Sequence, residues 1–175
     1  IGTAHAANFT DPKNIAKEKS DIFCFFDQTS IAIIPFETDY YSLISKKALQ
    51  KTKLIYSFGQ NKNCDFRIIT RENSVTKLMV IDKEFNFKNN QSSSNWEQNI
   101  IIILGLIRIL NITIKNVTPS IMKLTPIEGR GKKFQITYKK KSFTLIDESY
   151  NSNPESLTKA IENLKTVSYT HLTLP

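Results

Sequence analysis

In this 175-residue chain, Glu148 is the residue most clearly suited to ligand binding or catalysis. It follows a short apolar run that ends at Ile146. A strand that ends in a carboxylate just before a helix places that carboxylate at the carboxyl edge of a sheet, where α/β proteins bind ligands. The Ser, Asn and Pro residues that follow would serve equally well in a turn with a capped helix start. Both interpretations of this segment stay open on local grounds.

Two further side chains have groups that suit ligand binding. Arg130 lies between two glycines, and its planar guanidinium could donate paired hydrogen bonds to a phosphate. Asn99 precedes an apolar segment, and its amide offers both donors and an acceptor. The alternatives are a solvated arginine in a flexible linker and an ordinary polar helix start.

His5 and Lys19 carry groups that can take part in metal chemistry, but both residue types more often have simpler roles. A lone histidine is usually a hydrogen-bonded structural residue, and a lysine on a helix usually faces solvent. The two cysteines, Cys24 and Cys64, have neither metal-type spacing nor a disulfide framework. We therefore expect reduced, structural thiols.

Alternating strands and helices are expected to position these residues. Asp11 and Pro12 start a helix, which carries Ile15, Ala16, Lys19 and Ile22 and so has an apolar stripe at helical spacing. A second helix over 39–51 would bury Tyr40, Leu43, Ile44 and Leu49. Strands are expected at 31–35, 53–58, 66–68, 75–81 and 85–87, further helices at 96–110 and 154–164, and a hairpin at 133–138 and 143–147. This order predicts an α/β protein with a mostly parallel sheet.

Composition and charge exclude some classes of function. The chain is 40% hydrophobic and 23% charged, which suits a globular protein with a buried core. Its net charge of +8 could indicate a nucleic-acid partner, but the lysines are scattered and the one tight run, 139–141, falls at the expected hairpin turn. The longest apolar run, 100–110, is shorter than the roughly 20 residues of a membrane span. We expect a buried helix there, no nucleic-acid partner and no membrane span.

The segment Ile146-Asp147-Glu148-Ser149-Tyr150-Asn151-Ser152-Asn153-Pro154 resembles the signature of the Mur ligase family, in the branch that adds D-alanyl-D-alanine. The pattern there is a hydrophobic strand, two acidic residues and then Ser-Tyr-Asn-x-Asn-Pro. The resemblance implies that Glu148 contacts the nucleotide ribose. It also implies that Asn151 binds nucleotide and substrate, and that Asn153 binds substrate.

The segment Ile1-Gly2-Thr3-Ala4-His5 resembles the family's strand end Asn-Ile-Gly-x-Ala-His, and the sequence around Lys19 also matches. The resemblance implies that His5 binds Mg²⁺ and that Lys19 is a carbamylated, catalytic metal ligand. A carbamate supplies oxygen ligands to a hard cation, whereas a lysine ammonium would be repelled by it. The family often has a Glu two residues after the His, where this chain has Ala7.

Two more segments match in the same order. Residues 94–99 lie where the family has His-x-x-x-Asn, so Asn99 would contact the adenine of ATP, while Asn95 replaces the His. Residues 126–131 resemble the family's Gly-Arg element. Arg130 would therefore be a catalytic residue that reaches the ATP phosphates as the domains close.

The resemblance also implies a domain organisation. Residues 1–118 would be the second half of a central ATP-binding domain, and residues 119–166 a linker and the beginning of a Rossmann-like carboxyl-terminal ligase domain. The family's Gly-x-x-Gly-Lys-Thr phosphate loop is absent from the chain, so we expect it, with the UDP-sugar domain, upstream of Ile1. Residues 167–175 resemble a translated sequencing adaptor and are expected to be foreign to the protein.

By this resemblance the full-length protein would be a cytoplasmic, monomeric ligase. It would use ATP and Mg²⁺ to add D-Ala-D-Ala to a UDP-N-acetylmuramoyl-tripeptide through an acyl phosphate, and the chain by itself would be inactive. The alternatives are another Mur-type ligase, a folylpolyglutamate-synthase-like ligase, and a basic nucleic-acid-binding module. The Ser-Tyr-Asn-x-Asn-Pro pattern disfavours the first two, and the scattered lysines disfavour the third.

Overall fold

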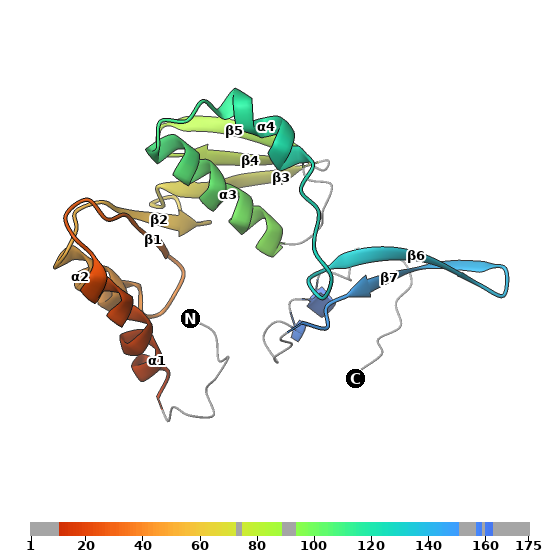
Figure 1. Cartoon of the computed structure of the whole chain (residues 1–175), viewed down its shortest axis with the longest axis horizontal. Coiled ribbons are helices and arrows are strands. Elements are labelled where there is room, and N and C mark those ends of the chain that lie inside the picture. The colour runs from red at the N-terminus through yellow and green to blue at the C-terminus, as the bar shows by residue number, and fades with distance from the viewer. Residues whose placement is uncertain (1–10, 73–74, 89–93, 151–156, 159, 163–175) are drawn as a thin grey trace. The chain divides into compact units, whose positions relative to one another are not determined.

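The computed structural model describes residues 11–72, 75–88, 94–150, 157–158 and 160–162 of the chain (Figure 1). Its contacts divide the chain into two compact units, residues 1–118 and residues 119–175. The first unit contains a five-stranded sheet flanked by helices, and the second contains a two-stranded hairpin. The α/β class predicted from the sequence is confirmed.

The strands of the large sheet lie side by side in sequence order. They are β1 (Ala32–Pro35), β2 (Ile55–Gly59), β3 (Phe66–Glu72), β4 (Val75–Val80) and β5 (Lys83–Lys88). β1, β2 and β3 pair in parallel, whereas β3, β4 and β5 form an antiparallel meander. Only β4 therefore runs against the other strands, which agrees with the expected mostly parallel sheet.

One face of β1 and β2 is covered by the helices that precede and follow β1. α1 (Pro12–Lys19) leads into the short 3₁₀ helix η2 (Ser20–Phe25), and α2 (Tyr41–Leu49) connects β1 to β2. The parallel pairing of β1 and β2 requires a crossover of this kind. The core between these elements consists of Phe23, Ala32, Ile34, Ile44 and Ala48.

Two side chains that we expected in this core face solvent. Ile22 is 59% exposed and Leu49 is 57% exposed. α1 ends at Lys19, and the tighter turn of η2 brings Phe23 inward in place of Ile22. On α2, Ala48 lies against the sheet, and the next residue is rotated by about 100° away from it.

The helix α3 (Ser94–Ile109) packs over β2, β3 and β4 on the other face of the sheet (Figure 1). On this face the rings of Tyr56 and Phe66 stack with their centroids 5.6 Å apart, whereas Ile55 points into the α2 core. A Cβ atom added to Gly105 would lie 2.4 Å from Cε2 of Phe66. The missing side chain at Gly105 therefore lets α3 approach the sheet closely.

The sequence predicts a linker around Pro119, but the structure has the helix α4 (Ile114–Met122) there. The fixed φ of proline suits a helix, but inside one it removes a backbone donor and its ring crowds the carbonyl four residues earlier, here that of Lys115. The Thr118 hydroxyl donates a hydrogen bond to the Ile114 carbonyl at 2.9 Å in the turn before the proline. Within the described ranges, no helix is long and apolar enough to cross a membrane.

The second unit contains the predicted hairpin, with strands β6 (Lys132–Tyr138) and β7 (Lys141–Asp147). Its two-residue turn consists of Lys139 and Lys140, whose φ angles are 47° and 61°. Positive φ at both central positions is typical of a type I′ turn, which matches the twist of the flanking strands. The tight lysine run is therefore an exposed turn, as expected.

Candidate functional site

Lys19 is the last residue of α1, and its side chain is exposed. Asp11 caps the start of the helix, and its carboxylate accepts a hydrogen bond from the Lys13 amide at 2.8 Å. Within the described part of the chain, the Lys19 amino group has no hydrogen bond or ion pair. An amino group of this kind is available for carbamylation. His5, the expected partner at the metal, lies outside the described residues.

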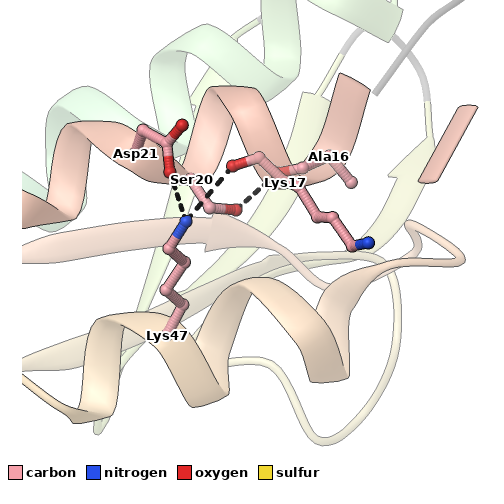
Figure 2. Close-up of polar contacts among 5 residues, drawn as sticks. All are labelled: Ala16, Lys17, Ser20, Asp21 and Lys47. Carbon is pink, nitrogen blue, oxygen red and sulfur yellow. Dashed lines mark hydrogen bonds and ion pairs between the residues drawn. The ribbon is translucent and has the colours of Figure 1, made fainter. Parts of the chain in front are cut away.

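A polar contact between two helices fixes the position of this end of α1 (Figure 2). From α2, the Lys47 ammonium forms an ion pair with Asp21 and donates a hydrogen bond to the Lys17 carbonyl at 3.4 Å. The buried Ser20 hydroxyl donates to the Ala16 carbonyl at 2.5 Å. These contacts lie beside Lys19, so they hold its backbone while leaving its side chain in solvent.

Asn99 lies near the start of α3, and its side chain is exposed, as a ligand contact requires. Two residues earlier, Glu97 is buried with 4% of its surface exposed. Its carboxylate accepts hydrogen bonds from Nε of Arg71 and from the Thr76 hydroxyl, each at 2.5 Å. This cluster ties the first turn of α3 to β3 and β4 and so fixes the helix that carries Asn99.

Glu37 is a carboxylate at the carboxyl edge of the sheet that we did not predict as a site residue. It follows β1, and its Oε1 accepts hydrogen bonds from the Gln60 and Asn61 amides at 2.6 Å and 2.7 Å, after the end of β2. The pKa of the Cys64 thiol is raised to about 11, mainly by burial and to a lesser extent by the negative charge of Glu37. Cys64 is therefore a protonated, structural thiol, as the sequence suggested.

In the second unit, Asp147 connects the two segments that resemble the family at positions 126–131 and 146–154. Its Oδ2 accepts a hydrogen bond from the Gly129 amide at 2.8 Å, and its carbonyl accepts one from the Gly131 amide at 2.7 Å. Its Oδ1 accepts from the Ser149 hydroxyl at 2.7 Å and from the Ser149 amide at 3.1 Å. Sequence reasoning gave Asp147 no role, because only a folded chain shows that these segments meet.

The charged groups that we expected to contact a nucleotide lie around this junction. The guanidinium carbon of Arg130 lies over the Tyr150 ring, 4.6 Å from its centroid. Glu148 lies beside Gly131, where an added Cβ would be 3.1 Å from its Oε1. Partial desolvation raises the pKa of Glu148 above its usual range, and the negative charge of Asp147 adds a smaller effect in the same direction. Hydrogen bonds from Ser149 and then from Gly129 lower the pKa of Asp147.

The structure thus brings two of the predicted residues, Arg130 and Glu148, to one junction in the second unit. In the first unit it places Lys19 and Asn99 on separate helices, both exposed. Asn151 and Asn153 lie outside the described residues, as does His5. Among the residues that are described, no group of three or more His, Cys, Asp or Glu side chains could hold a metal ion.

Comparison with known proteins shows to which family the chain is similar. A family model described as the Mur ligase middle domain matches residues 1–107. A relative in Rickettsia prowazekii, named UDP-N-acetylmuramoyl-tripeptide–D-alanyl-D-alanine ligase, is 29% identical, and the alignment covers 95% of this chain and 37% of the relative. The chain therefore spans little more than a third of the length of this relative.

Solved structures have the same fold at lower sequence identity. A crystal structure of MurF from Acinetobacter baumannii matches 94% of this chain and 36% of its own length, with a TM-score of 0.75 and 22% identity. A UDP-N-acetylmuramoyl-L-alanyl-D-glutamate–2,6-diaminopimelate ligase matches with a TM-score of 0.64 and 17% identity, over 90% of this chain and 32% of its own. Since the family model covers residues 1–107, more than half of the 175 residues, the chain belongs to the Mur ligase family.

Proposed function

We propose that the full-length protein containing this chain is an ATP-dependent ligase that joins D-Ala-D-Ala to a UDP-N-acetylmuramoyl-tripeptide. The strongest support is the similarity, along 95% of the chain, to the Rickettsia prowazekii ligase that carries this activity in its name. By the family resemblance, this protein would be a cytoplasmic, monomeric enzyme. Residues 1–118 would be part of its ATP-binding domain, and residues 119–166 the start of its ligase domain.

In the proposed reaction, the terminal carboxylate of the tripeptide attacks the γ-phosphate of ATP, and ADP leaves. The amine of D-Ala-D-Ala then attacks the acyl phosphate, and inorganic phosphate leaves as the amide bond forms. Activation is needed because a free carboxylate is a poor electrophile. Negative charge gathers where carboxylate and phosphates meet, so catalysis depends on groups that position and neutralise it.

Residues of this chain would supply several of those groups. The exposed Asn99 amide suits the adenine edge, and the Arg130 guanidinium suits phosphate oxygens. The partly desolvated Glu148 would accept hydrogen bonds from the ribose hydroxyls. Asn151 and Asn153 would contact nucleotide and substrate.

A magnesium ion would be held by His5 and by a carbamate on Lys19. The amino group of Lys19 is exposed and has no partner among the described residues, which fits this role, since carbamylation converts it into an anionic oxygen ligand. The ion would offset negative charge on the phosphates. The two residues belong to the first unit, and the contacts of Lys47 hold the backbone next to Lys19.

The test is a coupled assay of the full-length protein with ATP, Mg²⁺ and UDP-N-acetylmuramoyl-tripeptide. Phosphate release should depend on D-Ala-D-Ala, and mass spectrometry should show the pentapeptide product. A parallel reaction with a folate and glutamate tests the folylpolyglutamate-synthase alternative. Phosphate release that occurs only in that second reaction, or a product that lacks the dipeptide, would contradict the proposal.

A further inference from the structure

The loop that carries Arg130 is fixed on both sides by the turn at residues 147–150. Gly129 is held by the Asp147 carboxylate at 2.8 Å, and Gly131 by the Asp147 carbonyl at 2.7 Å. The Gly129 carbonyl also accepts a hydrogen bond from the Tyr150 amide at 3.0 Å. Arg130 therefore stands between two backbone anchors, both formed by the same turn.

The two glycines make this close contact possible. Their φ angles are 76° for Gly129 and 88° for Gly131, a region that residues with a side chain rarely adopt. A Cβ added to Gly129 would lie 2.6 Å from the Cβ of Tyr150. The backbone around Arg130 thus has little room for another conformation while the turn is in place.

The Tyr150 ring also restricts the side chain of Arg130. The guanidinium carbon of Arg130 lies over the ring, 4.6 Å from its centroid, which is a cation–π contact. Among the described residues, no hydrogen bond or ion pair uses the guanidinium N–H donors, so they can still bind a ligand. No ion pair joins Arg130 to a described carboxylate, Asp147 included, so the cation–π contact with Tyr150 is the described contact that orients this group.

We propose that Asp147 and Tyr150 are positioning residues that hold Arg130 with its N–H edge ready for the nucleotide phosphates. This inference rests on the proposed function for the role of Arg130. Asp147 acts on the backbone through Gly129 and Gly131, and Tyr150 acts on the guanidinium. Neither residue needs to touch the nucleotide.

The experiment compares variants of the full-length protein. Tyr150→Leu should raise the KM for ATP about threefold, the effect expected from loss of a cation–π contact at an exposed site. The matched control, Tyr150→Phe, keeps a ring and should behave like the wild type. Asp147→Asn should also raise the KM for ATP, because one amide oxygen cannot replace both carboxylate oxygens. None of the three should change the KM for D-Ala-D-Ala, whereas a general loss of folded protein would lower kcat and leave both KM values unchanged.

A double-mutant cycle tests whether Tyr150 acts through Arg130. In an Arg130→Ala background, Tyr150→Leu should have no further effect on the KM for ATP. A full threefold effect in that background would mean that Tyr150 contacts the nucleotide itself and would overturn the inference. A Tyr150→Leu variant with wild-type constants would overturn it as well.

Calorimetric binding of a non-hydrolysable ATP analogue separates this inference from the proposed function. The analogue should bind about threefold more weakly to Tyr150→Leu than to Tyr150→Phe. If this difference appears but no dipeptide is added to the substrate, the proposed function fails and the positioning role stands. If ligation is normal but both variants bind the analogue equally, only the positioning role is refuted.

Discussion

Replacement of Gly105 with alanine tests how closely α3 is seated on the sheet. The new Cβ would lie 2.4 Å from Cε2 and 2.6 Å from Cδ2 of Phe66, where carbon atoms normally stay about 3.5–4.0 Å apart. Phe66 is fully buried and stacked on Tyr56, so its ring cannot move aside freely. Overpacking of a core typically lowers the free energy of unfolding by about 1–3 kcal/mol. Alanine has a higher helix propensity than glycine, which offsets about 1 kcal/mol of this loss. The close approach favours the upper end, so we expect a net loss of about 2 kcal/mol.

Urea unfolding of the 175-residue chain measures this loss. Trp96 is the single tryptophan and lies in α3, so its fluorescence reports on the affected helix, with circular dichroism as a second probe. The control is the same change in a Phe66→Leu background, where the smaller side chain relieves the clash. There Gly105→Ala should be neutral or stabilise by up to about 1 kcal/mol. An alanine variant as stable as the wild type with Phe66 present would refute the close-packing argument.

Four other outcomes are expected. In the full-length enzyme, Lys19→Ala should abolish ligation and Lys19→Glu should retain more, because a carboxylate can replace the carbamate; equal, near-wild-type turnover in both would argue against a metal role. The 175-residue chain alone should not hydrolyse ATP above a heat-killed control, since it contains no Gly-Lys-Thr loop. Native iodoacetamide labelling at pH 8 should spare Cys64, whose pKa of about 11 leaves about one thiolate in a thousand, and modify the exposed Cys24; labelled Cys64 without denaturant would contradict this. The pKa of Asp147 is lowered in the fold, so its stabilising hydrogen bonds should be complete above the ordinary pKa of 3.8 and be lost as the pH falls through the lower folded value. The NMR shift of the Gly129 amide proton should therefore change with a midpoint below pH 3.8.

The sequence predicted the large sheet and most of the elements around it because their signals are local. Asp11 and Pro12 marked the start of α1, and alternating apolar residues marked β4. The errors arise where contacts with a neighbouring element determine how far a helix continues. Ile22 was expected inside because a helix continued past Lys19 would bury it, but the change to η2 turned Phe23 inward. A linker was expected from residue 119, yet α4 continues through Pro119 to Met122.

The candidate site was predictable only as separate residues. Arg130 and Glu148 were found from their own chemistry and from the family resemblance. Their meeting at Asp147 depends on hydrogen bonds between residues 18 positions apart, from Gly129 to Asp147. The Glu97–Arg71 pair is similar, since its partners lie on α3 and β3, and neither sequence segment shows that the other is near.

The irregular pairing between Ile68 and Thr70 has a consequence for how this chain compares with its relatives. Ile68 pairs with Leu78 and Thr70 with Lys77, so Ile69 has no partner of its own. This extra residue lets Arg71, rather than Thr70, lie opposite Thr76 and reach Glu97. A homologue could lose residue 69 and keep every later side chain on its present face of the sheet. One-residue gaps should therefore be tolerated at this point of β3, whereas elsewhere in the strand a deletion would turn its core residues outward.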